Sequence, residues 1–189
     1  MKIESLPLKG LVKLTPHQFR DHRGVFWETW RQGTLDEAAG EALEFVQENL
    51  SISKAGTLRG LHFQRAPHAQ GKLVRAASGR VWDVAVDVRE GSETRGQWYA
   101  CELSEENGCQ LWIPPGFAHG FLALTDGAVV EYRCTAFYHP ESEGSVHWND
   151  AQIGIDWAQS GLAWGAKGPA LSEKDAAAPT LEEAGWPFG

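Results

Sequence analysis

Short runs of alternating apolar and polar residues, separated by glycine-containing turns, constrain this chain more than any other feature. They extend over residues 10–138, and the breaks between them contain Gly24, Gly56, Gly79, Gly91, Gly108 and Gly127. A period of two places successive side chains on opposite faces of a strand, and regularly spaced turns connect many short strands. The pattern predicts an all-β sandwich or barrel.

Helical sequence is confined to the margins of this pattern. Residues 34–45, which are dense in Ala, Leu and Glu, predict one helix, and residues 172–178 predict a helical turn. Residues 160–189 are rich in Gly, Ala, Pro and Trp, and we expect them to wrap the sheets as a tail that packs through its aromatic rings. There is no internal repeat or linker, so the 189 residues predict a single domain over residues 1–189.

Charge, cysteine content and hydropathy exclude several classes of function. A net charge of −8 would repel a phosphate backbone, which argues against nucleic-acid binding, although a few local arginines can hold a single nucleotide. Cys101, Cys109 and Cys134 form neither a disulfide framework nor a Cys-x-x-Cys metal pair. The chain lacks an apolar signal core and any stretch of the roughly 20 apolar residues that span a bilayer. We therefore expect a cytoplasmic protein without a membrane partner.

Alternation within residues 81–88 separates two faces of one predicted strand. One face carries Trp82 and three valines, and the other carries Val81, Ala85 and two aspartates, Asp83 and Asp87. An aspartate among apolar neighbours is either a hydrogen-bonding partner inside a barrel cavity or a residue on an exposed face. We favour the cavity for Asp83.

Two neighbouring runs, residues 57–64 and 70–74, place one histidine close to one lysine. A neutral imidazole, with a pKa of about 6.5, can take a proton beside a carbonyl, while an ammonium such as that of Lys72 holds the negative charge that then develops on oxygen. His62 can equally be a packed, hydrogen-bonded strand histidine. Alternation puts Arg59 on the face opposite His62, so both can face one ligand only if the strand bulges, and Gly60 permits a bulge.

Further blocks lie before and after these runs, at residues 19–28, 47–51, 81–89, 110–121, 131–135, 148–150 and 171–175. Together with residues 57–74 they resemble the dTDP-4-dehydrorhamnose 3,5-epimerase family of the cupin superfamily, over nearly the whole chain. The resemblance implies a cupin-type jelly-roll barrel with short peripheral helices, and a homodimer. It also implies a substrate of the dTDP-4-keto-6-deoxyglucose type, and neither a cofactor nor a metal.

The resemblance also implies a set of catalytic residues. The carbonyl of a 4-keto sugar acidifies the protons on both adjacent carbons, so a base can remove one and an acid can return a proton to the opposite face. The base matches His62, the acid matches Tyr132, and Lys72 would hold the enolate oxygen. Asp175 matches the carboxylate that orients the base.

Substrate contacts follow from the same resemblance. Arginine matches the forked geometry of a diphosphate better than lysine does, and the aromatic face of Tyr138 would lie under the nucleotide base. The expected contacts are Arg23, Glu28, Gln47, Glu48, Asn49, Arg59, His119, Tyr138, Glu143 and Lys174. Two positions depart from the family, because Glu48 and Ala136 stand where aspartate is usual. Either departure could alter nucleotide selectivity or determine which carbon is inverted.

Three alternatives remain open at this point. The chain could invert only C3 or only C5. It could be a metal-dependent cupin isomerase or oxygenase with His62 and His119 as ligands, although the usual His-x-His pair is missing and a cation, Lys72, stands where a neutral donor would be needed. It could also be a non-catalytic sugar-nucleotide-binding module, but binding alone needs neither a base nor an acid.

Overall fold

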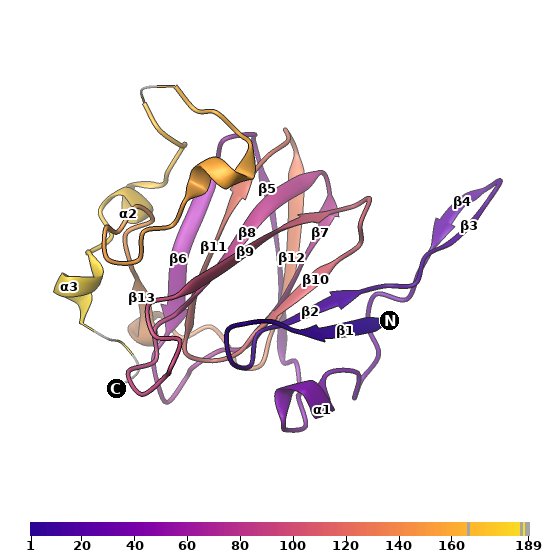
Figure 1. The fold of residues 1–189 in the computed structure, drawn as a ribbon, viewed down its shortest axis with the longest axis horizontal. Coiled ribbons are helices and arrows are strands. Elements are labelled where there is room, and N and C mark those ends of the chain that lie inside the picture. Colours follow the sequence, from indigo (N-terminus) through magenta and orange to yellow (C-terminus); the bar gives the residue numbers. More distant parts are fainter. Residues whose placement is uncertain (166, 186, 188–189) are drawn as a thin grey trace.

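The computed structural model describes residues 1–165, 167–185 and 187, and its strands form two antiparallel sheets and a separate hairpin (Figure 1). The six-stranded sheet has the order β1 (Lys2–Ser5), β2 (Val12–Thr15), β10 (Gln110–Ile113), β7 (Lys72–Ser78), β12 (Ala128–Cys134) and β5 (Gln47–Ser53). The five-stranded sheet has the order β13 (Glu143–Ser145), β6 (Leu58–Gln64), β11 (Phe117–Ala123), β8 (Arg80–Asp87) and β9 (Trp98–Ser104). The all-β prediction is confirmed.

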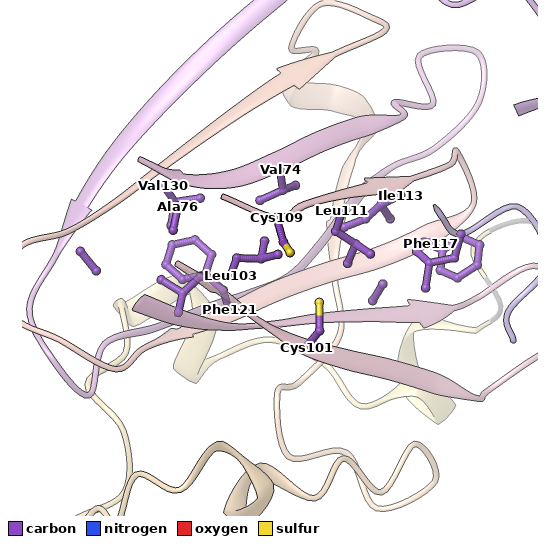
Figure 2. Close-up of a cluster of buried hydrophobic side chains, with 14 of the residues drawn as sticks. Val74, Ala76, Cys101, Leu103, Cys109, Leu111, Ile113, Phe117, Phe121 and Val130 are labelled. Atoms are coloured by element: carbon purple, nitrogen blue, oxygen red, sulfur yellow. The ribbon is translucent and has the colours of Figure 1, made fainter. Parts of the chain in front are cut away.

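The main hydrophobic core lies between these two sheets (Figure 2). Alternate residues of the facing strands contribute to it, so that Val74 and Val130 of one sheet meet Leu103 and Phe121 of the other. Cys101 also lies here, and burial, with smaller contributions from neighbouring groups, raises the pKa of its thiol to about 12. This thiol therefore stays protonated at neutral pH and packs as a small apolar side chain.

The five-stranded sheet is buried on its outer face as well. Val84 and Val86 of β8 pack there against Trp157 and Leu181 of the C-terminal segment, whereas Val81 and Ala85 face the main core. The tail prediction is confirmed for the described part of residues 160–189, where Trp164 packs edge to face against Trp148. Residues 166, 186, 188 and 189 of that tail lie outside the described residues.

Short helices border the sheets, and the predicted helix over residues 34–45 is wrong in length. Only α1 (Asp36–Ala39) is helical, because Gly40 takes a left-handed conformation with φ 78° and ends it. Leu43 and Phe45 instead pack in extended chain against the outer face of the six-stranded sheet, beside Trp112. This burial outweighs the helix propensity of residues 40–45.

The remaining helices lie beside β6 and β13 at the C-terminal end (Figure 1). The predicted turn over residues 172–178 is confirmed as α2 (Glu173–Ala176). α3 (Leu181–Ala184) was not predicted, although Thr180 and Glu183 form a capping box, which is a recognisable sequence signal. Two 3₁₀ turns, η1 (Pro140–Ser142) and η2 (Trp157–Ser160), complete the set. No helix in the described part of the chain is long and apolar enough to cross a membrane.

A hairpin of β3 (Phe19–Asp21) and β4 (Gly24–Phe26) projects away from both sheets (Figure 1). Its phenylalanines are far from buried, since Phe19 is 58% exposed and Phe26 is 72% exposed. Large apolar side chains on a projecting arm mark a surface that gains stability when it is covered.

Candidate active site

An irregularity in β6 directs the two predicted ligand-facing residues of this strand into one cavity. The register between β6 and β11 shifts between His119 and Phe121, beside Gly60. Gly60 has φ 130°, and a Cβ atom on it would lie 2.5 Å from the Cα atom of Gly120. As a result Arg59 and His62 both line the cavity, as predicted.

The cavity lies between the sheets and has a volume of about 450 Å³. An adjoining cavity of about 250 Å³ shares three of its lining residues, His62, Lys72 and Tyr132. Two adjoining cavities of this size suit an elongated ligand with two chemically different ends. The first contains Arg59, His119, Lys174 and Asp175, and the second contains Gln47, Asn49, Tyr138 and Glu143.

His62 is held by a carboxylate. Its Nε2 atom lies 2.6 Å from Oδ1 of Asp175, whose side chain is 4% exposed. Ser172 caps α2 by accepting a hydrogen bond from the backbone N–H of Asp175, which fixes this residue at the start of the helix. Burial would raise the pKa of Asp175, but the hydrogen bond from His62 and its charge outweigh burial, so the pKa is lowered. An ionised carboxylate therefore orients the imidazole.

Lys72 and Tyr132 lie together on the six-stranded sheet, and the Lys72 ammonium is 6.0 Å from the centroid of the Tyr132 ring. Burial lowers the pKa of Lys72, while the nearby carboxylates of Asp83 and Glu143 act in the opposite direction. Burial raises the pKa of Tyr132, so its phenol holds a proton at neutral pH. His62 comes from the five-stranded sheet, so the base and acid candidates line the cavity from different sheets.

Asp83 is completely buried, and its Oδ2 atom lies 2.9 Å from Nε2 of His119. The alternative of an exposed face is therefore wrong for Asp83, which is a buried hydrogen-bonding partner of a residue that lines the cavity. His119 lines the first cavity and pairs with His62 in the register of β11 and β6.

The second cavity collects residues predicted to bind the nucleotide. Gln47 accepts a hydrogen bond from the backbone N–H of Tyr138 and donates to Asn49. Glu143 accepts from the Tyr138 hydroxyl at 3.0 Å and pairs with Lys174. Burial would raise the pKa of Glu143, but its bonds to Lys174 and Tyr138 outweigh burial and lower it. Tyr138 thus lies at the cavity wall, held through its backbone N–H by Gln47 and through its hydroxyl by Glu143.

Three predicted substrate contacts lie outside both cavities of this chain. Arg23 is on the projecting hairpin and pairs with Asp21, while Glu28 pairs with Arg31. Glu48 points to the outer face of β5, since alternation places it opposite Gln47, and it pairs with Arg133. The structure therefore does not bring these three side chains to His62.

Other cavity residues were not identified from the sequence. Ser51 lines the first cavity because it follows Gln47 and Asn49 on the same face of β5. Gln64, which shares a face of β6 with His62, accepts from the backbone N–H of His139 and donates to the carbonyl of Phe137. Period two would have indicated both residues.

Facing antiparallel sheets that enclose a histidine, a tyrosine and a lysine around one cavity define a class, the cupin-type jelly-roll barrel. Comparison with known proteins agrees with this. A model of the dTDP-4-dehydrorhamnose 3,5-epimerase family matches residues 5–183, and the chain belongs to this family of isomerases.

The most similar relatives cover almost the whole chain. A dTDP-4-dehydrorhamnose 3,5-epimerase of Salmonella typhimurium is 54% identical over 177 residues, which are 94% of this chain and 93% of that protein. A dTDP-6-deoxy-D-glucose-3,5-epimerase from Legionella pneumophila, solved in complex with dTDP-4-keto-L-rhamnose, is 46% identical with a TM-score of 0.87, covering 96% of this chain and 93% of its own. The epimerase of Mycobacterium tuberculosis is 40% identical with a TM-score of 0.92, and the match covers 100% of this chain and 94% of that one. The resemblance inferred from the sequence motifs is confirmed, and so is the implied barrel fold.

Proposed function

We propose that this enzyme epimerises a dTDP-4-keto-6-deoxyhexose at both C3 and C5. The observation that carries the proposal is the placement of His62, bonded to Asp175, and Tyr132 on different sheets around one cavity. An inversion needs a base and an acid on opposite faces of the sugar ring. The family supports the substrate class, because relatives 54% and 45% identical in sequence are named 3,5-epimerases.

Each inversion proceeds in two proton transfers. His62 takes the proton from the carbon beside the ketone, and the electron pair of the broken C–H bond moves onto the carbonyl oxygen to form an enolate. The Lys72 ammonium holds that oxygen. When the carbonyl re-forms, the carbon takes a proton from Tyr132 on the other face, and solvent returns His62 and Tyr132 to their starting states. A positioned acid or base typically contributes about 10²–10⁴-fold in rate.

The adjoining cavities suggest how the rest of the substrate lies. Arg59, fixed by a hydrogen bond from its Nε to Ser53, would bind the diphosphate, and Gln47, Asn49 and Tyr138 would bind the nucleotide base. His119, Glu143 and Lys174 complete the proposed contacts of this chain.

A homodimer accounts for the predicted contacts that lie elsewhere. Arg23 and Glu28 lie outside the cavities of their own chain, on or just after a projecting hairpin with exposed phenylalanines. The hairpin of a second copy would bring an arginine and a glutamate to the nucleotide while covering its apolar rings. Leu50 and Ile52, exposed on the edge strand β5, offer apolar surface for the same contact. We propose further that the chain acts as one domain in the cytoplasm, where its three unpaired, buried cysteines stay reduced.

Proton NMR of dTDP-4-keto-6-deoxyglucose with the enzyme in deuterium oxide tests the proposed reaction. Signals of the protons at C3 and C5 should both disappear as deuterium enters, and the signals of the doubly inverted sugar should appear. The matched control is the same incubation without enzyme. Exchange at one carbon alone would show a mono-epimerase, and binding without any exchange would show a sugar-nucleotide-binding module.

The metal-dependent rival is tested separately. Activity should survive dialysis against a chelator, because every proposed proton transfer and charge contact is made by a side chain and none by a metal. In the described residues His62 and His119 each direct Nε2 at a carboxylate, and no group of three His, Cys, Asp or Glu residues is placed to hold a metal. Loss of turnover on chelation, restored by one divalent metal, would favour the metal-dependent alternative.

A further inference from the structure

The first cavity contains a second histidine–carboxylate pair whose carboxylate has no part in the steps above. His119 of β11 bonds Asp83 of β8, and β11 lies directly between β8 and β6, the strand of His62. The pairs His62–Asp175 and His119–Asp83 therefore stand on neighbouring strands of the same sheet, with both rings lining the cavity.

The burial of Asp83 is energetically unfavourable for a group with so few partners. Its side chain is 0% exposed, its Oδ2 bonds only to His119, and within the described residues its Oδ1 has no hydrogen-bond partner. A buried carboxylate with an unsatisfied oxygen destabilises a fold. Such a group is a candidate for a functional role rather than a structural one.

Asp87 shows what a structural carboxylate on this strand looks like. It lies on the same face of β8 and is equally buried, but it accepts hydrogen bonds from the side chains of Arg89, Ser92 and Thr94. Asp87 lines neither cavity of the site. The two aspartates therefore form a matched pair in which only Asp83 has a cavity residue as its partner.

The bond to Asp83 decides which nitrogen of His119 is available. Because Nε2 points at the carboxylate, Nδ1 is the nitrogen left for the cavity, and it has no hydrogen-bond partner among the described residues. A carboxylate hydrogen-bonded to one nitrogen of an imidazole stabilises the imidazolium form, in which both nitrogens carry protons. In that form Nδ1 of His119 can donate a hydrogen bond. Lys72 lines the same cavity.

We propose that Asp83 is a positioning residue, which holds His119 so that Nδ1 donates a hydrogen bond to the sugar carbonyl oxygen beside the Lys72 ammonium. Two donors would then share the charge that develops on the enolate oxygen. This inference rests on the proposed epimerase function. The Asp83 charge also favours the ammonium form of Lys72, against the burial that lowers the Lys72 pKa.

A double-mutant cycle tests the coupling. Asp83→Ala should lower kcat about tenfold or more, as the loss of an orienting partner usually does, and should leave the affinity for dTDP unchanged because dTDP has no keto sugar. Asp83→Asn, whose amide oxygen can still accept a hydrogen bond from Nε2, should show a smaller decrease in kcat. Measured at a pH low enough for Lys72 to be protonated in every variant, the variant with both Asp83→Ala and His119→Ala should be no slower than His119→Ala alone, since Asp83 then acts only through His119.

Asp87→Asn is the control. It removes a buried carboxylate from the same strand face, so it should lower stability while the folded protein keeps its kcat. The proposal is overturned if the Asp83 and His119 effects multiply, if Asp83→Ala and Asp83→Asn change only stability, or if Asp87→Asn lowers kcat as much as Asp83→Asn.

Nitrogen-15 NMR of histidine-labelled free enzyme gives a reading that does not depend on turnover. In the wild type Nε2 of His119 should carry a hydrogen-bonded proton. In Asp83→Asn, which keeps the shape of the side chain, the nitrogen-15 chemical shift of this Nε2 should change. An unchanged His119 spectrum would overturn the inference. A wild type without epimerase activity but with this spectrum would overturn the proposed function and leave the positioning of His119 standing.

Discussion

His62 and Tyr132 lie on different walls of one cavity, so the two halves of an inversion can be removed one at a time. His62→Asn should stop the loss of substrate protons to solvent while dTDP binding persists. Tyr132→Phe should leave some exchange from the His62 side with retained configuration, while net inversion falls about a hundredfold or more. Deuterium incorporation and product formation, followed by NMR, separate the two. Parallel loss of exchange and inversion in both folded variants would refute the two-sided assignment.

The pH dependence should report Lys72. Burial lowers its pKa below the ordinary 10.5, so as pH rises the ammonium loses its proton earlier than an exposed lysine would, and the enolate loses its counter-charge. We expect kcat to fall on the alkaline side, below the ordinary lysine pKa. Tyr132 does not explain such a fall, because burial raises its pKa above the ordinary 10.0.

Lys72→Gln isolates this effect. It should lower kcat by about 10²–10³-fold, as the loss of an oxyanion donor does, and should abolish the alkaline limb in a profile of kcat against pH. The same limb in Lys72→Gln as in the wild type would assign the titration to another group.

At the scale of one strand, the bulge of β6 depends on Gly60. Gly60→Ala would place a Cβ atom 2.5 Å from the Gly120 Cα atom and 2.8 Å from the His119 carbonyl oxygen, so the two strands would have to separate. We expect a loss of about 3 kcal/mol or more in the free energy of unfolding, measured by urea denaturation, and a larger proportional loss of kcat, because Arg59 and His62 would no longer face the same cavity.

Gly127→Ala, in the turn before β12, is the control for the steric contact at Gly60. Gly127 also has a positive φ, 72°, but a Cβ atom added there would meet nothing within 4 Å beyond its chain neighbours, so only the backbone conformation opposes the substitution. This variant should lose about 1–2 kcal/mol and keep its activity. Equal losses in the two variants would show that backbone conformation, and not the contact with β11, limits Gly60.

At the scale of the whole molecule, the projecting hairpin predicts a dimer. Light scattering at micromolar concentration should give about twice the 20.8 kDa mass of one chain. Phe26→Asp places a charge on the most exposed ring of the hairpin and should weaken both dimerisation and dTDP binding, while the chain stays folded. The conservative Phe26→Leu should retain the dimer. A monomeric wild type with full activity would contradict the proposed role of the hairpin.

The sequence by itself determined the architecture and the family, and it proposed the reactive groups. Period-two alternation predicts which faces of β8 are apolar, and order and spacing of the motifs were enough to identify the family. Local chemistry also identified Gly60 as the residue that permits a bulge and predicted the turn at α2, because glycine conformation and helix capping depend on residues close in the chain.

Only the tertiary structure decided which groups meet. Asp175 reaches His62 across 113 positions, a pairing that the family resemblance implied but no local pattern specifies, and His119 reaches Asp83 across 36 positions, a pairing that nothing in the sequence indicated. Tertiary packing also overrode local preference at residues 40–45, where burial of Leu43 and Phe45 on the sheet replaced the predicted helix. It likewise placed Arg23 and Glu28 outside the cavity, because the direction of a hairpin depends on how it leaves the sheets and not on its own residues.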